Sequence, residues 1–277
     1  MTATGQEAAT PTTIVIERAP PILEITLARP PANAVTAQLA RELHAALVLL
    51  RDDPALRVGI ISGGTGRIFC AGWDLKDAAL ATDPTEANQA IMDLPGGFAG
   101  ITEFWNLGKP LIAAVNGFAI GGGFEIALAC DIILAAEQAA FALPEMQRGF
   151  VPDAGAVQRL PRRVPYNVAM EMMLTGRRMS AQEAAQWGLV HAVMPSADLP
   201  ARAREMALTI ADGAPLAVQA LLEVMPAVDR LPLPEAFANL RHPAGSLPAY
   251  ERMLVSEDFL EGPRAFAEKR LPVWRGR

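Results

Sequence analysis

The chain has 277 residues, of which 51% are hydrophobic and 19% are charged, so it can bury a sizeable core and is not a disordered chain. Its 24 Lys and Arg residues against 30 Asp and Glu residues give a net charge of −6. A protein that coats nucleic acid needs many basic contacts to phosphates, and this chain contains no basic block. We therefore expect no nucleic-acid partner.

Cysteine use and the N-terminus bear on the compartment. Cys70 and Cys130 lie inside apolar stretches, which excludes a disulfide framework and favours a reducing compartment. Residues 1–13 lack the basic and apolar regions of a secretion signal, so we expect a frayed tail and a cytoplasmic protein. The apolar stretch 110–124 contains Asn116 and four glycines and is too short to span a bilayer, so no membrane partner is expected.

The order of elements predicts a mixed α/β core. Leucines recur at helical spacing from 39 to 50 behind a possible Thr36 cap, and a short helix is expected at 125–130 after three glycines. Strands are predicted, in chain order, at 14–16, 23–27, 58–61, 111–115, 132–136 and 189–193, the first two forming a hairpin or meander.

The last third of the chain differs from the rest. Ser180 to Glu183 form a capping box, and Gly188 lies where that helix should stop. Beyond Pro200 there is no strand signal, only helical windows at 201–211, 215–225 and 256–269. We therefore expect a tail at 1–13, a core at 14–205 and a helical region at 206–277.

Glu125 is the strongest catalytic candidate, because it is the only charged residue between Leu111 and Cys130. Desolvation should raise the pKa of a carboxyl in such a setting, as a general acid or base requires. The alternative is that Glu125 lies on a solvated helix face or pairs with an arginine, and we favour the catalytic interpretation. The glycines 121–123 leave backbone N–H groups open to a ligand at a helix start, and an oxyanion hole is the best reading because no P-loop or dinucleotide fingerprint is complete.

The other candidates carry weaker signals. Glu145 supplies a second carboxylate twenty residues after Glu125, although an exposed loop glutamate is commoner. Asp153 is either a helix N-cap or a site residue. Trp73 either packs in the core or offers its ring face to a ligand cation. The three histidines are scattered without ligand spacing, so no metal site is expected.

Taken together, these segments resemble the crotonase (enoyl-CoA hydratase/isomerase) superfamily, from about Ile14 to the C-terminus. The resemblance to the superfamily rests on Phe69–Lys76, Gly121–Glu125 and Leu143–Glu145. Within the superfamily the chain most resembles the carnitinyl-CoA dehydratase family, on the segments 71–76, 141–145, 151–153 and 256–277. It implies an α/β fold, a spiral of ββα units followed by a helical C-terminal region that builds homotrimers or hexamers. It also implies a hydro-lyase that hydrates or dehydrates an acyl-CoA thioester, with coenzyme A as part of the substrate and no other cofactor.

The resemblance assigns roles residue by residue. The backbone N–H groups of Trp73 and Gly122 would hold the thioester oxygen, while Glu125 orients water and Glu145 handles the α-proton. For CoA or substrate binding it implies, in chain order, Arg29, Ala71, Asp74, Lys76, Asp153 and Lys269. Two alternatives remain: a double-bond isomerase that uses Asp153, and a non-catalytic CoA-binding or assembly protein on the same scaffold.

Overall fold

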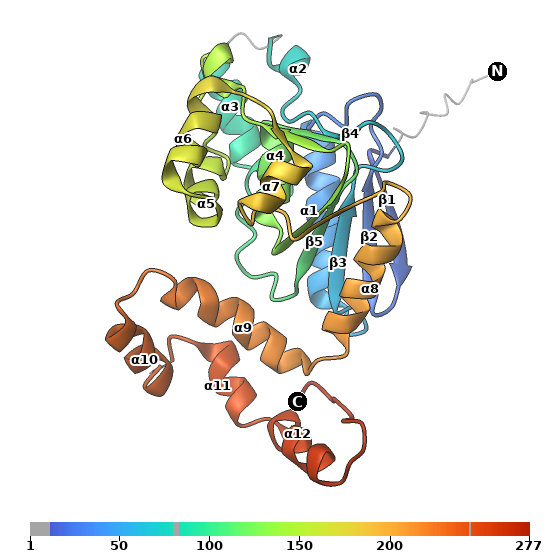
Figure 1. Cartoon of the computed structure of the whole chain (residues 1–277), viewed down its shortest axis with the longest axis vertical. Coiled ribbons are helices and arrows are strands. Elements are labelled where there is room, and N and C mark those ends of the chain that lie inside the picture. Colours follow the sequence, from blue (N-terminus) through green and yellow to red (C-terminus); the bar gives the residue numbers. More distant parts are fainter. Residues whose placement is uncertain (1–11, 80–82, 244) are drawn as a thin grey trace, which may run out of the picture.

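The computed structural model describes residues 12–79, 83–243 and 245–277 (Figure 1). The expected N-terminal tail at 1–13 lies outside these residues except for its last two. Of these, Thr13 donates both its N–H and its hydroxyl to a carboxylate oxygen of Glu42, each at 2.7 Å, so this end of the described chain is tied to a helix.

A six-stranded sheet forms the larger layer, in the order β1-β2-β3-β5-β7-β10. The hairpin expected at its edge is confirmed, because β1 and β2 pair antiparallel, whereas every later neighbour pairs parallel. The strands are β1 (Ile14–Ala19), β2 (Ile22–Leu27), β3 (Val58–Ser62), β5 (Leu111–Val115), β7 (Ile132–Ala136) and β10 (Ala192–Met194). The last strand was predicted at 189–193. It begins later because the N–H groups of Leu189 and Val190 bond back to the carbonyl of Ala184 in the preceding helix.

A second sheet of four short strands was not predicted. Its order is β4-β6-β8-β9, with β4 (Ile68–Cys70), β6 (Phe118–Ile120), β8 (Ala140–Ala142) and β9 (Met179–Ser180). Each of the pairs β3 and β4, β5 and β6, and β7 and β8 places one strand in each sheet. The chain therefore turns through both sheets three times, and the ends of these turns carry the loops that form the cavity described below.

Helices cover both faces of the larger sheet. The caps predicted at Thr36 and Ser180 are confirmed, because the two hydroxyls accept from the N–H groups of Leu39 and Glu183. The helices before residue 212 are α1 (Ala37–Asp52), α2 (Leu75–Ala79), α3 (Pro84–Met92), α4 (Gly122–Ala129), α5 (Ala156–Arg163), α6 (Tyr166–Thr175), α7 (Ala181–Gln186) and α8 (Leu199–Ala211), with 3₁₀ turns η1 (Phe98–Gly100) and η2 (Glu145–Arg148).

Alternation along the strands builds two separate cores. Leu23, Ile25 and Leu27 of β2 face the core that contains α1 and α4. Ile22 of β2, together with Val58 and Ile60 of β3, faces the smaller core beneath α8. Successive residues of these strands enter opposite cores, so both faces of the sheet are packed. The sheet is therefore a firm support for the loops that line the cavity.

Beyond α8 the described chain is helical, as predicted, and it leaves the core. Figure 1 shows the remaining helices extending from the lower end of the sheet, away from α2, α3 and α4. They are α9 (Pro215–Val228), α10 (Leu233–Arg241), α11 (Pro248–Leu254) and α12 (Glu257–Ala267). No single helix among the described residues is long and apolar enough to cross a membrane; α8 and α9 together meet the length and composition test, but they are bent by 102°.

Candidate active site

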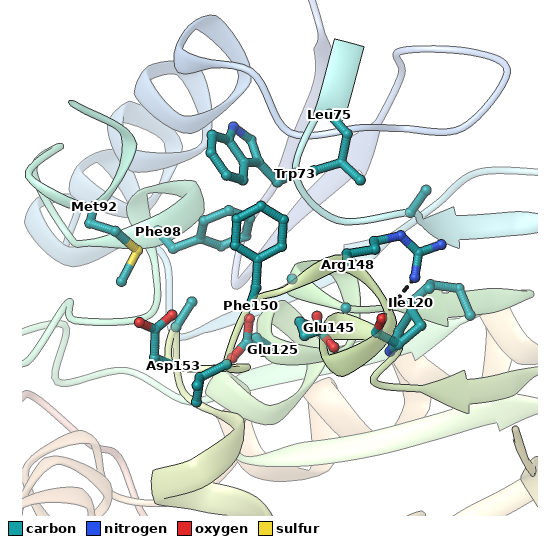
Figure 2. Close-up of a pocket in the computed structure, with 16 residues that line it drawn as sticks. Trp73, Leu75, Met92, Phe98, Ile120, Glu125, Glu145, Arg148, Phe150 and Asp153 are labelled. Carbon is teal, nitrogen blue, oxygen red and sulfur yellow. Dashed lines mark hydrogen bonds between the residues drawn. The ribbon is translucent and has the colours of Figure 1, made fainter. Parts of the chain in front are cut away.

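A cavity of about 190 Å³ opens at the end of the core opposite the C-terminal helices (Figures 1 and 2). Its walls come from the loop between β4 and α2, the start of α4, η2 and the loop before α5. Both predicted glutamates, Glu125 and Glu145, line it together with Ala71, Trp73 and Gly122. With Asp153, which also lines the cavity, the fold brings together six of the residues that the sequence analysis placed in one site.

The three glycines before Glu125 belong to a tightly packed helix start. The predicted helix began at Glu125, whereas α4 begins at Gly122 behind Gly121, whose φ is +56°. A Cβ atom on Gly121 would lie 2.6 Å from Oε1 of Glu145, and one on Gly122 would overlap the Phe98 ring. A Cβ atom on Gly123 would overlap the carbonyl oxygen of Cys70. Glycine is required here because side chains would push the walls of the cavity apart.

Two backbone N–H groups are available to a ligand oxygen. Val35 donates to the carbonyl of Gly72 at 2.7 Å and accepts from the N–H of Asp74 at 3.0 Å, so the intervening N–H of Trp73 points to the other side of this short bridge. The N–H of Gly122 lies in the first turn of α4, where no helical carbonyl precedes it. A Cβ on Gly72 would lie 2.8 Å from the nitrogen of Gly122, so the two loops are in contact.

Glu125 is buried, with 3% of its surface exposed, which excludes the solvated-face interpretation. Its Oε1 accepts the N–H of Ala156, the first residue of α5, at 2.9 Å. Burial raises the pKa of Glu125 to about 8; the Ala156 N–H opposes this rise, and the nearby Glu145 and Asp153 add to it. The carboxyl group therefore holds a proton near neutral pH and can exchange it there.

Glu145 is the second carboxyl group of the cavity. Burial also raises its pKa, and Asp153 adds to the rise, while the backbone and Arg148 oppose it. Its Oε2 is buried without a hydrogen-bond partner in the described part of the chain. A buried oxygen without a hydrogen-bond partner lowers the stability of the fold. We therefore expect Oε2 of Glu145 to bond to a group of a bound ligand.

The raised pKa of Glu125 predicts how stability depends on pH. The native protein keeps a proton that the unfolded chain, with an ordinary pKa of 4.5, releases. The free energy of unfolding should therefore fall as pH rises from about 4.5 to 8, on the order of a few kcal/mol at 1.4 kcal/mol per pK unit. Chemical denaturation at a series of pH values measures this. Glu125→Gln should flatten the decline, and an equal decline in that variant would contradict the assignment.

Asp153 lies in the same cavity but does not cap a helix. The N-cap of α5 is Gly155, which makes no side-chain cap, and the carboxylate that caps the helix comes from Glu125. The Asp153 carboxylate is exposed and has neither a hydrogen bond nor an ion pair with any residue the structure describes. The N-cap interpretation of Asp153 is therefore wrong, and its carboxylate faces the cavity.

Aromatic side chains that the sequence did not single out complete the wall. Phe98 from η1 and Phe150 after η2 line the cavity beside Met92. The Trp73 indole packs edge-on against Phe150, with ring centroids 5.8 Å apart, and against the hydrophobic core. Figure 2 shows the Phe150 ring between the indole and Glu125. No sequence pattern links these three rings, because they come from different segments.

The residues expected to bind CoA fall into two groups. Arg29 and Asp74 form an ion pair at 2.7 Å, and the Asp74 carboxylate also accepts the N–H of Lys76, so this trio shapes the loop that follows Ala71. Lys269 follows α12, which Figure 1 places at the end of the molecule opposite the helices α2, α3 and α4 beside the cavity. Within one copy of the chain the structure therefore does not bring Lys269 to the site.

Arg159 is a charged residue next to the site, and the sequence analysis assigned it no role there. It lies on α5, donates to the carbonyl of Thr102 at 2.5 Å and stacks over the Trp105 ring at 5.7 Å. Its charge opposes the rise in the pKa of Glu125. Only the tertiary packing of α5 against α4 brings it there.

Comparison with known proteins agrees with this arrangement. The family model described as enoyl-CoA hydratase/isomerase matches residues 17–277. A carnitinyl-CoA dehydratase of Salmonella typhi is 53% identical over 257 residues, which is 93% of this chain and 96% of that protein. Solved enoyl-CoA hydratases from Mycobacterium tuberculosis H37Rv and Bacillus anthracis superpose with a TM-score of 0.85, at 37% and 36% identity, and each comparison covers 96% of this chain and all of the other. The chain belongs to the enoyl-CoA hydratase/isomerase family, and it is a hydro-lyase with a crotonase fold.

Proposed function

We propose that the protein reversibly adds water across the α,β double bond of a CoA thioester whose acyl group ends in a trimethylammonium group, as in crotonobetainyl-CoA. The observation that carries the proposal is that two carboxyl groups, the buried Glu125 and the partly buried Glu145, line one cavity beside the backbone N–H groups of Trp73 and Gly122. The cationic acyl group is supported by the 53% identity to a carnitinyl-CoA dehydratase.

In the hydration direction the two carboxyl groups divide the work. Ionised Glu125 orients a water molecule and accepts its proton while the water oxygen bonds to the β-carbon. The electron pair of the double bond moves to the thioester as an enolate, and protonated Glu145 delivers its proton to the α-carbon. This cycle needs one proton on the pair. The charge of Glu145 adds to the rise in the pKa of Glu125, so ionising both groups at once is disfavoured, and hydration proceeds from the form in which the proton lies on Glu145. Dehydration runs the same steps backward.

The developing charge on the thioester oxygen is stabilised by the N–H groups of Trp73 and Gly122. Such donors act where charge appears in the transition state, and the loss of one typically costs about 10²- to 10³-fold in rate. We assign the loop of Ala71, Asp74 and Lys76, with Arg29 behind it, to the CoA portion, because it adjoins Trp73.

We also infer that the chain self-associates as a homotrimer or hexamer through α9–α12. These helices and the segment after them expose large apolar side chains, with Phe266 at 88%, Val255 at 86% and Leu271 at 86%. Apolar side chains gathered in one region are typical of a surface that a partner covers. A neighbouring copy is also the route by which Lys269 would reach CoA.

A second candidate, a double-bond isomerase, is favoured by one observation, the Asp153 carboxylate in the cavity. An isomerase needs a proton acceptor and donor but no water, so it has no use for Glu125 as a group that orients water. Exchange of solvent deuterium into an isomerised enoyl-CoA, without net water addition, would identify this activity. Thermal stabilisation by CoA without any turnover would instead indicate a binding protein.

Substrate preference tests the proposal. We expect loss of the enoyl-thioester absorbance to be faster with crotonobetainyl-CoA than with crotonyl-CoA, by at least about tenfold in kcat/KM, because only the former carries the cation. The hydrated product is checked by mass. A preference for crotonyl-CoA would retain the hydratase activity and contradict the acyl group proposed here.

A further inference from the structure

We propose that Asp153 binds the cationic end of the acyl group and thereby sets substrate specificity; this inference rests on the proposed function. The cavity lining contains the carboxyl groups of Glu125, Glu145 and Asp153 against one described cation, Arg148, whose guanidinium donates to the carbonyl of Pro144 at 2.9 Å. The reaction accounts for the two glutamates. The proposed reaction assigns no role to Asp153.

The position of Asp153 matches the order of atoms in the substrate. Figure 2 shows the three carboxyl groups in a row, with Glu145 nearest Arg148, Glu125 in the middle and Asp153 at the other end, on the side of Met92. If Glu145 serves the α-carbon and Glu125 the β-carbon, the next position along the acyl chain lies at Asp153. In crotonobetainyl-CoA the quaternary nitrogen is attached to the next carbon.

The chemistry of this end of the cavity suits a quaternary ammonium group. Such a cation has no N–H to donate, so it is recognised by a nearby negative charge and by aromatic faces rather than by hydrogen bonds. Asp153 offers a carboxylate that has no partner among the described residues, while Phe98 and Phe150 supply rings that line the same cavity. A neutral acyl group would desolvate the Asp153 carboxylate without compensating its charge, so the same residue also rejects neutral substrates.

The test compares charge at constant shape. The neutral isostere of crotonobetainyl-CoA is 5,5-dimethylhex-2-enoyl-CoA, in which a carbon atom replaces the quaternary nitrogen. We expect Asp153→Asn to lower the ratio of kcat/KM for the cationic over the neutral thioester by about 10- to 100-fold, mainly through KM. Asp153→Lys should lower it further and favour glutaconyl-CoA, whose acyl group ends in a carboxylate. Asp198→Asn, a substitution of an exposed aspartate at the start of α8, is the matched control and should keep the ratio.

Each outcome decides between the hypotheses. If the wild type discriminates between the two thioesters and Asp153→Asn discriminates equally well, the Asp153 site is wrong while the proposed function stands. If the wild type does not discriminate, the cationic acyl group is wrong and the Asp153 site is overturned with it. If Asp153→Asn lowers kcat equally for both thioesters, Asp153 acts on the reacting atoms, which overturns the specificity role and favours the isomerase.

Discussion

Glu125→Gln should lower kcat for hydration by about 10²- to 10⁴-fold, the range that a positioned general acid or base contributes. The amide cannot accept the proton of the attacking water, but its oxygen can still accept the N–H of Ala156, to which Glu125 now bonds at 2.9 Å. The fold should therefore persist, with the free energy of unfolding above pH 8 unchanged or higher, because a buried charge has been removed. Steady-state kinetics and denaturant unfolding on the same preparation measure both quantities.

A matched control for this substitution is Glu137→Gln, which changes an exposed glutamate in the turn between β7 and β8. That variant should keep wild-type kcat. Retention of more than a tenth of the wild-type kcat by Glu125→Gln would contradict its role as the group that activates water. A loss of activity accompanied by an equal loss of folded protein would point to a structural role instead.

Glu145→Gln should lower kcat by a similar factor, about 10²- to 10⁴-fold, because the amide cannot deliver a proton to the α-carbon. The α-protons of γ-butyrobetainyl-CoA, which has neither a double bond nor a β-hydroxyl group, report on Glu145 without the chemistry of water. In D₂O their exchange, followed by NMR, should be slowed more by Glu145→Gln than by Glu125→Gln. The reverse order would exchange the roles of the two groups.

Stability separates the two variants further. Oε2 of Glu145 is buried without a partner, so an amide in its place has no acceptor for its N–H groups among the described residues. At about pH 4, where the native carboxyl group is protonated and no buried charge is lost, we expect Glu145→Gln to cost about 1 to 3 kcal/mol of unfolding free energy, the usual penalty for an unsatisfied buried donor. Denaturant unfolding measures this difference. A melting curve whose transition lies above the assay temperature confirms that the protein remains folded when its activity is measured.

Much of the larger sheet could be predicted from the sequence because its signals are local. Thr36 caps α1, whose leucines recur at helical spacing, and the antiparallel pair β1 and β2 flanks a short turn. The second sheet could not be predicted, since β4 and β6 span three residues each and are too short to give a periodic signal in the sequence. Such strands form because their longer neighbours in the first sheet place them side by side.

The candidate site divides in the same way. Glu125 could be found from its isolation in an apolar run, and the expectation that it is buried is confirmed. Glu145 has only a weak local signal, and the resemblance alone suggests its role and that of the N–H of Trp73. Phe98 and Phe150 could not be found, since packing between distant segments, rather than sequence pattern, makes them neighbours.

The hydrogen bond from Ala156 to Glu125 links the evolutionary fate of the reaction to that of the fold. Helix α5 has glycine at its N-cap and makes no side-chain cap of its own, so the reactive carboxyl group also terminates a helix. A lineage that abandons catalysis through Ala or Gly at position 125 loses that cap at the same moment. A lineage that passes through Gln keeps it, so the accessible route from this enzyme to an inert relative on the same scaffold runs through the amide.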